Sequence, residues 1–252
     1  MQRNIAYNAL TLRVKPSGES NREAWFLSAG EGILKATVFG GPKSKLRAQV
    51  APFHEGKLWI YHDPVRDSRK VSDFDVGSYR TGIRELYERV MAANAVAETI
   101  LASHGGGSNW PEALKLSGGV LDLLDTADAA ASSRIAVYFF WRWAGILGVR
   151  PDLSVCASCA CEAGRDQVLW YSIREEALFC ENCLRRGRTD SPFRLGPGAR
   201  LWLREIETLD PPALARVSPV APSPDQWSAA RALAQAVLAG ALGKRLPTWD
   251  GI

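Results

Sequence analysis

Four cysteines in the second half of the chain are spaced as the ligands of a metal ion. Cys156 and Cys159 form one C-x-x-C pair, and Cys180 and Cys183 form a second pair after an interval of twenty residues. Each pair lets a tight turn present two sulfurs to one ion, and four thiolates are a common ligand set of structural zinc. A closed four-thiolate site keeps no open coordination position, so the spacing predicts Zn²⁺ as a structural cofactor rather than a catalytic metal.

Three other interpretations of these cysteines stay open. Disulfides are disfavoured because the N-terminal sequence MQRNIAYNALTLRVK has no apolar signal core, which also favours a cytoplasmic protein with reduced thiols. A redox C-x-x-C motif needs only one pair and a βαβ pattern around it, and unrelated buried thiols need no pattern at all. A fifth cysteine, Cys161, is interpreted as a bystander because the two pairs already match each other.

The segment that carries these cysteines is predicted to be a finger inserted between helices. Between the two pairs, Val168–Tyr171 and Ala177–Phe179 form a predicted hairpin that brings the second pair back to the first. Apolar periodicity predicts three helices before the finger and two after it, over residues 83–101, 109–127, 132–147, 197–209 and 227–242. Residues 211–224, with five prolines, are predicted to be a linker, and residues 247–252 a frayed tail.

The first third of the chain is strand-like and rich in turns. Its apolar segments are Leu10–Val14, in which Leu10, Leu12 and Val14 alternate with polar residues, and Ala24–Leu27, Ile33–Phe39, Leu58–Tyr61 and Val71–Val76. Short strands at this spacing are typical of a small closed barrel. The sequence therefore predicts an α+β multidomain protein, with a five-stranded OB-type barrel over residues 1–78 and a helical bundle over 79–252 that carries the four-cysteine finger at 154–186.

Positive charge is concentrated in the barrel region. The first 80 residues carry 13 Lys and Arg against 8 Asp and Glu, whereas the rest of the chain carries 18 against 19. Gly40–Arg47 lacks the frame of a P-loop, but its Lys43, Lys45 and Arg47, with Lys35 upstream, favour phosphate contacts; a solubilising loop is the other interpretation. A possible second basic patch follows the finger at Arg185, Arg186, Arg188 and Arg194, within Leu184–Arg204.

The sequence contains no recognisable catalytic constellation. Its three histidines have no nucleophile or ligand-spaced partner nearby, and there is no nucleophile elbow, dinucleotide glycine fingerprint or H-E-x-x-H motif. We therefore expect a protein that is not an enzyme. The longest apolar run, Ile135–Trp143, is interrupted by Arg142, so no membrane span is predicted.

Two short segments add to the order of barrel, bundle and inserted finger. Val50–Phe53 reads Val-Ala-Pro-Phe, and Leu147–Leu153 reads Leu-Gly-Val-Arg-Pro-Asp-Leu and leads into Cys156. Together these features resemble the RecO family of bacterial recombinational repair proteins over most of the chain. Ala160 stands where the family is expected to have a glycine, a departure that affects only the turn after Cys159.

The resemblance implies a non-enzymatic recombination mediator associated with the nucleoid. Such proteins bind single- and double-stranded DNA, anneal complementary strands and work with RecR. They help to load RecA onto strands coated by single-strand binding protein, whose acidic C-terminal tail they recognise. Carried onto this chain, the resemblance assigns DNA contacts to Lys35, Lys43, Lys45 and Arg47, with Arg66, Arg69 and Lys70 as further candidates.

Some residues and functions stay open in this interpretation. The aromatic residues Trp25, Phe26, Trp59 and Tyr61 include candidates for base stacking, but strand alternation places about half of them in the barrel core. Arg142 is a candidate either for the acidic tail or for a structural ion pair. An RNA-binding or ribosome-associated protein, which would prefer structured RNA, and a protein-interaction adaptor without DNA affinity are the alternative functions.

Overall fold

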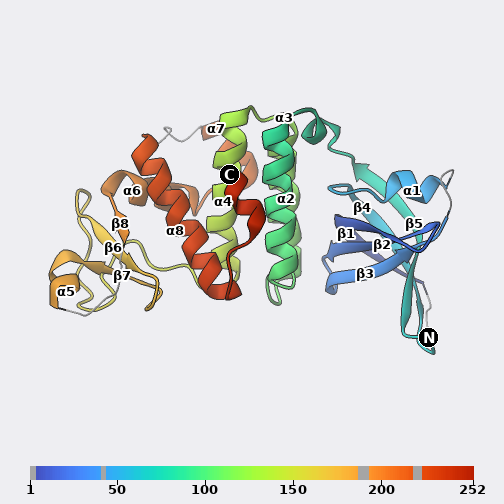
Figure 1. Cartoon of the computed structure of the whole chain (residues 1–252), viewed down its shortest axis with the longest axis horizontal. Helices are drawn as coiled ribbons and strands as arrows, with labels where there is room; N and C mark the ends of the chain where they lie inside the picture. Colours follow the sequence, from blue (N-terminus) through green and yellow to red (C-terminus); the bar gives the residue numbers. More distant parts are fainter. Residues whose placement is uncertain (1–3, 41–43, 187–192, 218–222) are drawn as a thin grey trace. The chain divides into compact units, whose positions relative to one another are not determined.

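The N-terminal strands close into a barrel in the computed structural model, which describes residues 4–40, 44–186, 193–217 and 223–252 (Figure 1). The order around the barrel is β1-β2-β3-β5-β4, and β3 and β5 close it as a parallel pair with Thr37 opposite Lys70. The strands are β1 (Asn4–Ser17), β2 (Asn21–Ser28), β3 (Gly32–Val38), β4 (Glu55–Asp63) and β5 (Ser68–Ser78). This topology confirms the predicted five-stranded barrel.

Strand β1 is shared between two neighbours, and this sharing disturbs its alternation. Its first half pairs with β4 and its second half with β2, with a register shift between Thr11 and Arg13. Around this bulge Leu10, Thr11 and Leu12 are all buried. Strict alternation from Leu10 to Val14, as the sequence pattern indicated, is therefore wrong: Thr11 lies opposite the buried Phe26, and the register shift leaves Leu12 as an extra residue without a partner on β2.

The barrel core is built from large side chains on several strands. Phe26 on β2, Leu34 on β3, Leu58 on β4 and Phe74 on β5 are fully buried, and the rings of Phe26 and Phe74 meet edge to face at 6.1 Å. Between β3 and β4 the chain forms the short helix α1 (Lys45–Gln49). Part of the predicted basic loop is therefore helical.

The described chain forms two compact units, Met1–Ser132 with Gly251 and Ser133–Asp250 with Ile252. In the first unit the barrel is followed by η1 (Thr81–Glu85), α2 (Tyr87–Ala102) and α3 (Trp110–Thr126). Helix α2 ends before Gly105, Gly106 and Gly107, which all adopt positive φ angles that favour glycine. Pro111 lies in the first turn of α3, where its missing N–H costs no helical hydrogen bond.

One buried arginine joins the barrel to these helices. Arg80 donates to the carboxylate of Glu55, the first residue of β4, at 2.6 Å. It donates to the carbonyl of Phe53, just before β4, at 2.9 Å. It also donates to Asp122 at 2.7 Å and to the carbonyl of Gly118 at 3.2 Å on α3. The side chain is only 3% exposed, so these bonds replace water as the partner of the guanidinium.

The second unit contains most of the apolar helix α4 (Ala129–Ile146). Tyr138, Phe139, Phe140, Trp141 and Trp143 are fully buried, as expected for a central helix that is hydrophobic on nearly all sides. The remaining helical elements are α6 (Pro197–Ile206), α7 (Pro211–Val217), α8 (Pro224–Leu242) and η2 (Pro247–Gly251).

Two expectations for the C-terminal region are wrong. Residues 211–217 of the predicted linker form α7. The predicted frayed tail forms η2, in which Trp249 is 1% exposed and its ring centre lies 5.4 Å from that of Phe140. Helix α8 begins at a capping box in which Gln226 N–H donates to Ser223 Oγ and Ser223 N–H donates to Gln226 Oε1.

The finger lies between α4 and α6 in the chain. The predicted hairpin is formed by β6 (Leu169–Ser172) and β7 (Ala177–Cys180), followed by α5 (Glu181–Arg186). A third strand, β8 (Phe193–Leu195), pairs with β6 to give the sheet order β7-β6-β8. Within the described residues, no helix is long and apolar enough to cross a bilayer.

Candidate metal centre and nucleic-acid face

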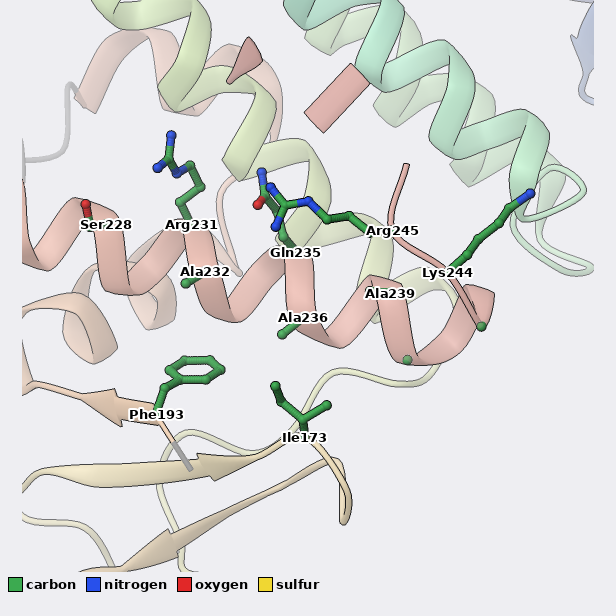
Figure 2. Close-up of a pocket in the computed structure, with 12 residues that line it drawn as sticks. Ile173, Phe193, Ser228, Arg231, Ala232, Gln235, Ala236, Ala239, Lys244 and Arg245 are labelled. Atoms are coloured by element: carbon green, nitrogen blue, oxygen red, sulfur yellow. The ribbon is translucent and has the colours of Figure 1, made fainter. Parts of the chain in front are cut away.

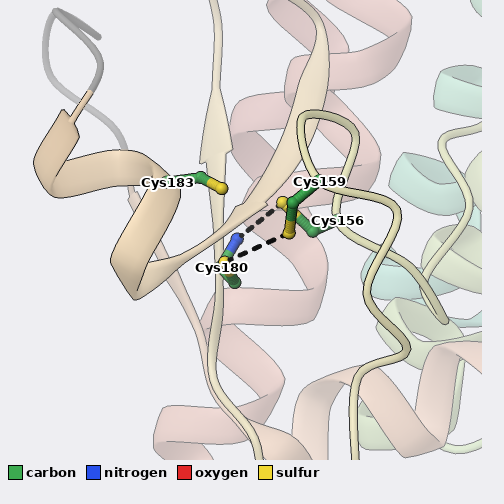
Figure 3. A group of neighbouring side chains, drawn as sticks. All are labelled: Cys156, Cys159, Cys180 and Cys183. Atoms are coloured by element: carbon green, nitrogen blue, oxygen red, sulfur yellow. Dashed lines mark hydrogen bonds between the residues drawn. The ribbon is translucent and has the colours of Figure 1, made fainter.

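The four predicted ligands converge at one end of the finger (Figure 3). The Sγ atoms of Cys156, Cys159, Cys180 and Cys183 all lie within 4.8 Å of one another, and those of Cys159 and Cys180 are 3.9 Å apart. Four sulfurs bound to one zinc at about 2.3 Å in a tetrahedron are about 3.8 Å apart. The thiol cluster therefore has the donor set and the size of a structural zinc site.

Backbone hydrogen bonds hold the two cysteine pairs together. Ala157 N–H donates to the carbonyl of Leu178 at 2.8 Å, which attaches the first pair to β7. Cys180 N–H donates to Cys156 Sγ at 3.3 Å (Figure 3), the kind of bond that stabilises a thiolate. Ala160 N–H donates to the carbonyl of Cys156 at 2.9 Å and closes the turn between the cysteines.

The electrostatics of the cluster fit a divalent cation. A hydrogen bond from the backbone N–H of Cys161 lowers the pKa of the Cys159 thiol to about 6. The hydrogen bond to Cys159 raises the pKa of Cys183 to about 12, because a thiol that donates to a thiolate holds its proton. A cation among the four sulfurs favours the deprotonated form of all of them and so removes this conflict.

A buried arginine fixes the loops of the finger to α6. Arg200 donates to the carbonyls of Leu153 at 3.2 Å, Ala163 at 3.3 Å and Arg165 at 3.1 Å, and also to that of Gly164. The residue is fully buried. Arg200 therefore holds the loop of the first cysteine pair and is not available to phosphate, although it lies in the basic stretch Leu184–Arg204.

On the barrel, three outward residues form a row across β1, β2 and β3. Trp25 on β2 lies opposite Arg13 on β1 and opposite Lys35 on β3, so the three side chains point to the same side of the sheet. The ammonium groups of Lys35 and Lys15 lie 5.2 and 5.8 Å from the centre of the Trp25 ring. We call Arg13, Lys15, Trp25 and Lys35 the Trp25 face.

Acidic side chains reduce the positive charge of this region only in part. Glu23 forms an ion pair with Lys35 at 2.8 Å, and Glu31 forms one with Arg69 at 2.9 Å. Exposed ion pairs of this kind are weak, typically up to about 1 kcal/mol, so a phosphate can compete for the same cations.

Other predicted DNA contacts lie on neighbouring elements of the barrel. Lys70 is on β5 opposite Thr37 and lies 5.3 Å from the ring of the exposed Phe39. Lys45 and Arg47 are on α1, and Arg22 on β2 donates to the Arg47 carbonyl at 3.4 Å. Arg66 is exposed between β4 and β5. Lys43 lies outside the described residues.

The remaining candidate aromatics differ sharply in position. Phe26 is fully buried in the core and cannot stack on a base, whereas Trp59 and Tyr61 on β4 are half-buried. Lys57 lies over the Trp59 ring at 5.4 Å, but the exposed Asp73 is opposite Trp59 and the exposed Asp75 is opposite Lys57. The surroundings of Trp59 are thus more acidic than the Trp25 face.

Arg185 of the second basic patch and Arg142 have structural partners. Arg185 forms an ion pair with Glu181 in α5, Arg186 and Arg194 are exposed, and Arg188 lies outside the described residues. Arg142 donates to the Leu209 carbonyl and, at 3.4 Å, to the Tyr138 hydroxyl. Its described hydrogen-bond partners are therefore a carbonyl and a phenol, not the carboxylate expected for a structural ion pair.

Arg13 and Lys15 were not among the residues expected to contact DNA. The signal that identifies them is the strand register, which places them beside Trp25. Alternation along one strand could not reveal it, because the bulge between Thr11 and Arg13 determines which residues of β1 turn outward.

A groove of about 680 Å³ runs along α8 in the second unit (Figure 2). Ala232 and Ala236 face Phe193 of β8 and Ile173, which follows β6. Lys244 and Arg245 lie at the C-terminal end of α8. Arg245 forms an ion pair with Asp250 at 2.8 Å, and Arg231 donates to the Ile252 carbonyl. Two arginines of the groove are therefore already paired with residues near the C-terminus.

Known proteins are similar to this chain over most of its length. The family model for the N-terminal part of recombination protein O matches residues 1–77, and the model for its C-terminal part matches residues 84–249. A DNA repair protein RecO of Desulfitobacterium hafniense is 26% identical over 201 residues, which cover 78% of this chain and 70% of that protein. One of Heliobacterium modesticaldum is 27% identical over 216 residues, covering 83% and 76%. One of Solidesulfovibrio magneticus is 26% identical over 226 residues, covering 88% and 84%.

Proposed function

The chain belongs to the RecO family of DNA repair proteins, and from this premise we propose that it is a non-enzymatic recombination mediator that binds DNA through its barrel. In this role it binds single- and double-stranded DNA and anneals complementary strands. With RecR it helps to load RecA onto strands coated by single-strand binding protein, at the nucleoid in the cytoplasm.

The Trp25 face is the observation that carries the DNA-binding proposal. It presents one indole and three cations on adjacent strands of an OB-type barrel. Base stacking on an aromatic ring and ion pairing with phosphates are the two interactions that OB barrels use for single strands. Because neither interaction reads a base edge, we expect binding that depends on salt but not on sequence.

The proposed phosphate contacts extend from this face onto the neighbouring elements. Arg13 and Lys15 join the cations expected from the sequence, which are Lys35, Lys43, Lys45, Arg47, Arg66, Arg69 and Lys70. The hydrogen bond from Arg22 to the Arg47 carbonyl supports this extension, because it places α1 beside the strand that carries Trp25. The basic residues after the cysteine pairs, Arg185, Arg186, Arg188 and Arg194, are the proposed second patch for phosphate contacts.

Fluorescence anisotropy of a labelled single-stranded oligonucleotide tests this proposal, with Trp25→Ala compared against Trp59→Ala. Both tryptophans are half-buried, and each has a lysine over its ring. Loss of one stacked base costs about 1–3 kcal/mol, so we expect Trp25→Ala to weaken binding by about tenfold or more and Trp59→Ala to leave it unchanged. Equal effects of the two variants would contradict the assignment of the face. Preference for structured RNA would favour an RNA-binding function, and lack of binding at low salt would favour an adaptor.

Apart from the second basic patch, the proposed division of labour assigns residues 1–78 to nucleic acid and residues 79–252, with the finger at 154–186, to partner proteins. For the acidic tail of single-strand binding protein we propose the groove along α8. Lys244 suits the carboxylates of such a tail, and Ile173, Phe193 and Ala236 line the same groove with apolar surface.

Binding of a synthetic acidic tail peptide tests the groove. Lys244→Glu is expected to weaken the peptide's affinity, since it places a like charge beside the acidic tail. Lys115→Glu, at an exposed position of α3, is the matched control and is expected to have no effect. If the two variants bind the peptide equally well, the tail binds elsewhere.

We propose that the metal of the finger is Zn²⁺, held by Cys156, Cys159, Cys180 and Cys183. When bound, the ion supplies folding free energy to the finger. The chain itself positions the ligands, because backbone N–H groups orient the thiolates and Arg200 holds the surrounding loops. Zinc analysis of the purified protein should give one ion per chain.

A further inference from the structure

Cys161 lies beside the metal centre without belonging to the four predicted ligands. Its Sγ atom is 3.2 Å from Cys159 Sγ, within the distance of a thiol hydrogen bond. The backbone fixes this position, because Cys156 N–H donates to the Cys161 carbonyl at 3.0 Å and Val155 forms a β-bridge with Glu162. The fifth thiol is therefore held against the cluster by the same loop that presents the first cysteine pair.

The cluster has one closed side and one open side. Cys156 and Cys180 are buried, whereas Cys159 and Cys161 are both exposed. A change of ligand at the buried positions would require the finger to repack, but a change between Cys159 and Cys161 takes place at the surface. Cys159 and Cys161 therefore both lie on the open side of the cluster, with their sulfurs 3.2 Å apart.

The distance between these two sulfurs is also one that a side chain can cover. Rotation of a cysteine by one staggered step of χ1 moves its sulfur by about 3 Å, close to the separation of the two thiols. Both side chains come from one turn, so neither needs the backbone to move far. The chain therefore carries five thiols for a site that uses four.

We propose that Cys161 is an alternative fourth zinc ligand that replaces Cys159. In the exchange the Zn–S bond to Cys159 breaks, the bond to Cys161 forms, and the proton of the Cys161 thiol passes to the Cys159 thiolate; no electron is transferred. The ion stays bound when Cys159 is lost or chemically blocked. This inference rests on the proposed zinc site.

The test compares Cys159→Ser with the double variant Cys159→Ser/Cys161→Ser, using Cys161→Ser and Cys156→Ser as controls. Zinc affinity is measured by competition with a chromophoric chelator, and Co²⁺ substitution reports thiolate ligation through its sulfur-to-cobalt absorption. Loss of an outer-shell partner alone costs about 10–100-fold in metal affinity, so loss of a direct ligand should cost at least about tenfold.

We expect Cys159→Ser to keep the four-thiolate cobalt spectrum and an affinity close to that of the unmodified protein. The double variant should lose one thiolate and bind at least about tenfold more weakly. Cys161→Ser should bind normally, and Cys156→Ser should bind weakly although Cys161 is present. Equal weakening in Cys159→Ser and the double variant would overturn the exchange alone. Failure of the unmodified protein to bind zinc would overturn the proposed zinc site itself.

Discussion

At the scale of single residues, Ala160 is strained in the turn after Cys159. Its φ of 54° lies in the left-handed region, where a Cβ atom costs about 1 kcal/mol and glycine costs little. We expect Ala160→Gly to raise the free energy of unfolding of the metal-loaded protein by about 1 kcal/mol. Urea denaturation measures this change.

The control for this substitution is Ala157→Gly, three residues earlier in the same turn. Ala157 is exposed and is not among the residues with positive φ, so glycine there only increases the freedom of the unfolded chain. It should lower the free energy of unfolding slightly. A similar loss in Ala160→Gly would show that strain at Ala160 is relieved in some other way.

His54 is expected to make the barrel sensitive to acid. Burial lowers the pKa of its imidazole, and its Nδ1 lies 2.8 Å from the Gln49 carbonyl. Because the folded protein resists protonation of this ring, stability is constant above the unfolded pKa of about 6.5 and falls as the pH drops below it toward the lower folded value. Urea denaturation at pH 7.5 and 5.5 should show this loss.

A variant separates His54 from other groups that titrate in the same range. His54→Gln keeps an amide that can donate to the Gln49 carbonyl but takes up no proton. We expect its free energy of unfolding to fall less than that of the unmodified protein between pH 7.5 and 5.5. An equal fall in both proteins would mean that another group is responsible.

Which aromatic residue faces solvent could not be predicted from one strand. Alternation requires that Trp25 and Phe26 lie on opposite sides of β2, but it does not say which side is the core. Closure of the barrel decides this, because Phe26 meets Phe74 from β5 inside it. The four cysteines were easier to predict, since the ligand spacing is local to each turn.

At the scale of elements, Arg80 is expected to hold α3 against the barrel. Arg80→Met removes four hydrogen bonds and leaves Glu55 and Asp122 without their common cation. Removal of one partner of a buried ion pair lowers the free energy of unfolding by about 3–5 kcal/mol. Because both carboxylates are partly exposed, we expect a loss of about 3 kcal/mol here. Urea denaturation measures the loss.

Arg84→Met is the matched control for this effect. Arg84 lies in η1 and is exposed, so the same substitution removes no buried interaction and should change the free energy of unfolding by about 0.5 kcal/mol or less. If Arg80→Met lowers the free energy of unfolding as little as Arg84→Met does, the packing of η1, α2 and α3 holds α3 against the barrel without the buried guanidinium.

Removal of the metal should unfold the finger selectively. We expect chelation to abolish hydrogen-exchange protection in β7, which ends at the ligand Cys180, and in β6, which pairs with it, because the metal supplies much of the folding free energy there. The barrel strands β1–β5 contain no ligand and should keep their protection. Loss of protection throughout the chain, or none in the finger, would contradict a local structural role.

The short C-terminal elements escaped sequence analysis for a physical reason. The prolines of residues 211–224 favoured a linker, yet Pro211 begins α7 and Pro224 begins α8, positions where a missing N–H does not matter. The tail is ordered by a contact distant in sequence, that of Trp249 with Phe140. Local patterns cannot reveal such a contact.

At the scale of the whole molecule, the order of barrel, helices and inserted finger was predictable because each part has its own local pattern. Alternation, helical periodicity and cysteine spacing each act within a few tens of residues. The Trp25 face was not predictable as a unit, because it needs the register of three strands and one bulge. The functional surface thus depends on the part of the fold that sequence patterns determine least.

The central claim is that the Trp25 face binds the phosphates of single-stranded DNA, and the salt dependence of binding tests it most directly. Anisotropy titrations across a salt series would compare the unmodified protein with Arg13→Ala/Lys15→Ala/Lys35→Ala. The control is Lys57→Ala/Arg84→Ala/Lys115→Ala, which removes three exposed cations elsewhere in the same unit. Each phosphate contact on a single strand contributes about 0.7 to the slope of log affinity against log salt.

We predict that the slope becomes shallower by about 2 in the face variant and stays unchanged in the control. Equal slopes in the face variant and the unmodified protein would contradict the account and move the DNA site to another surface.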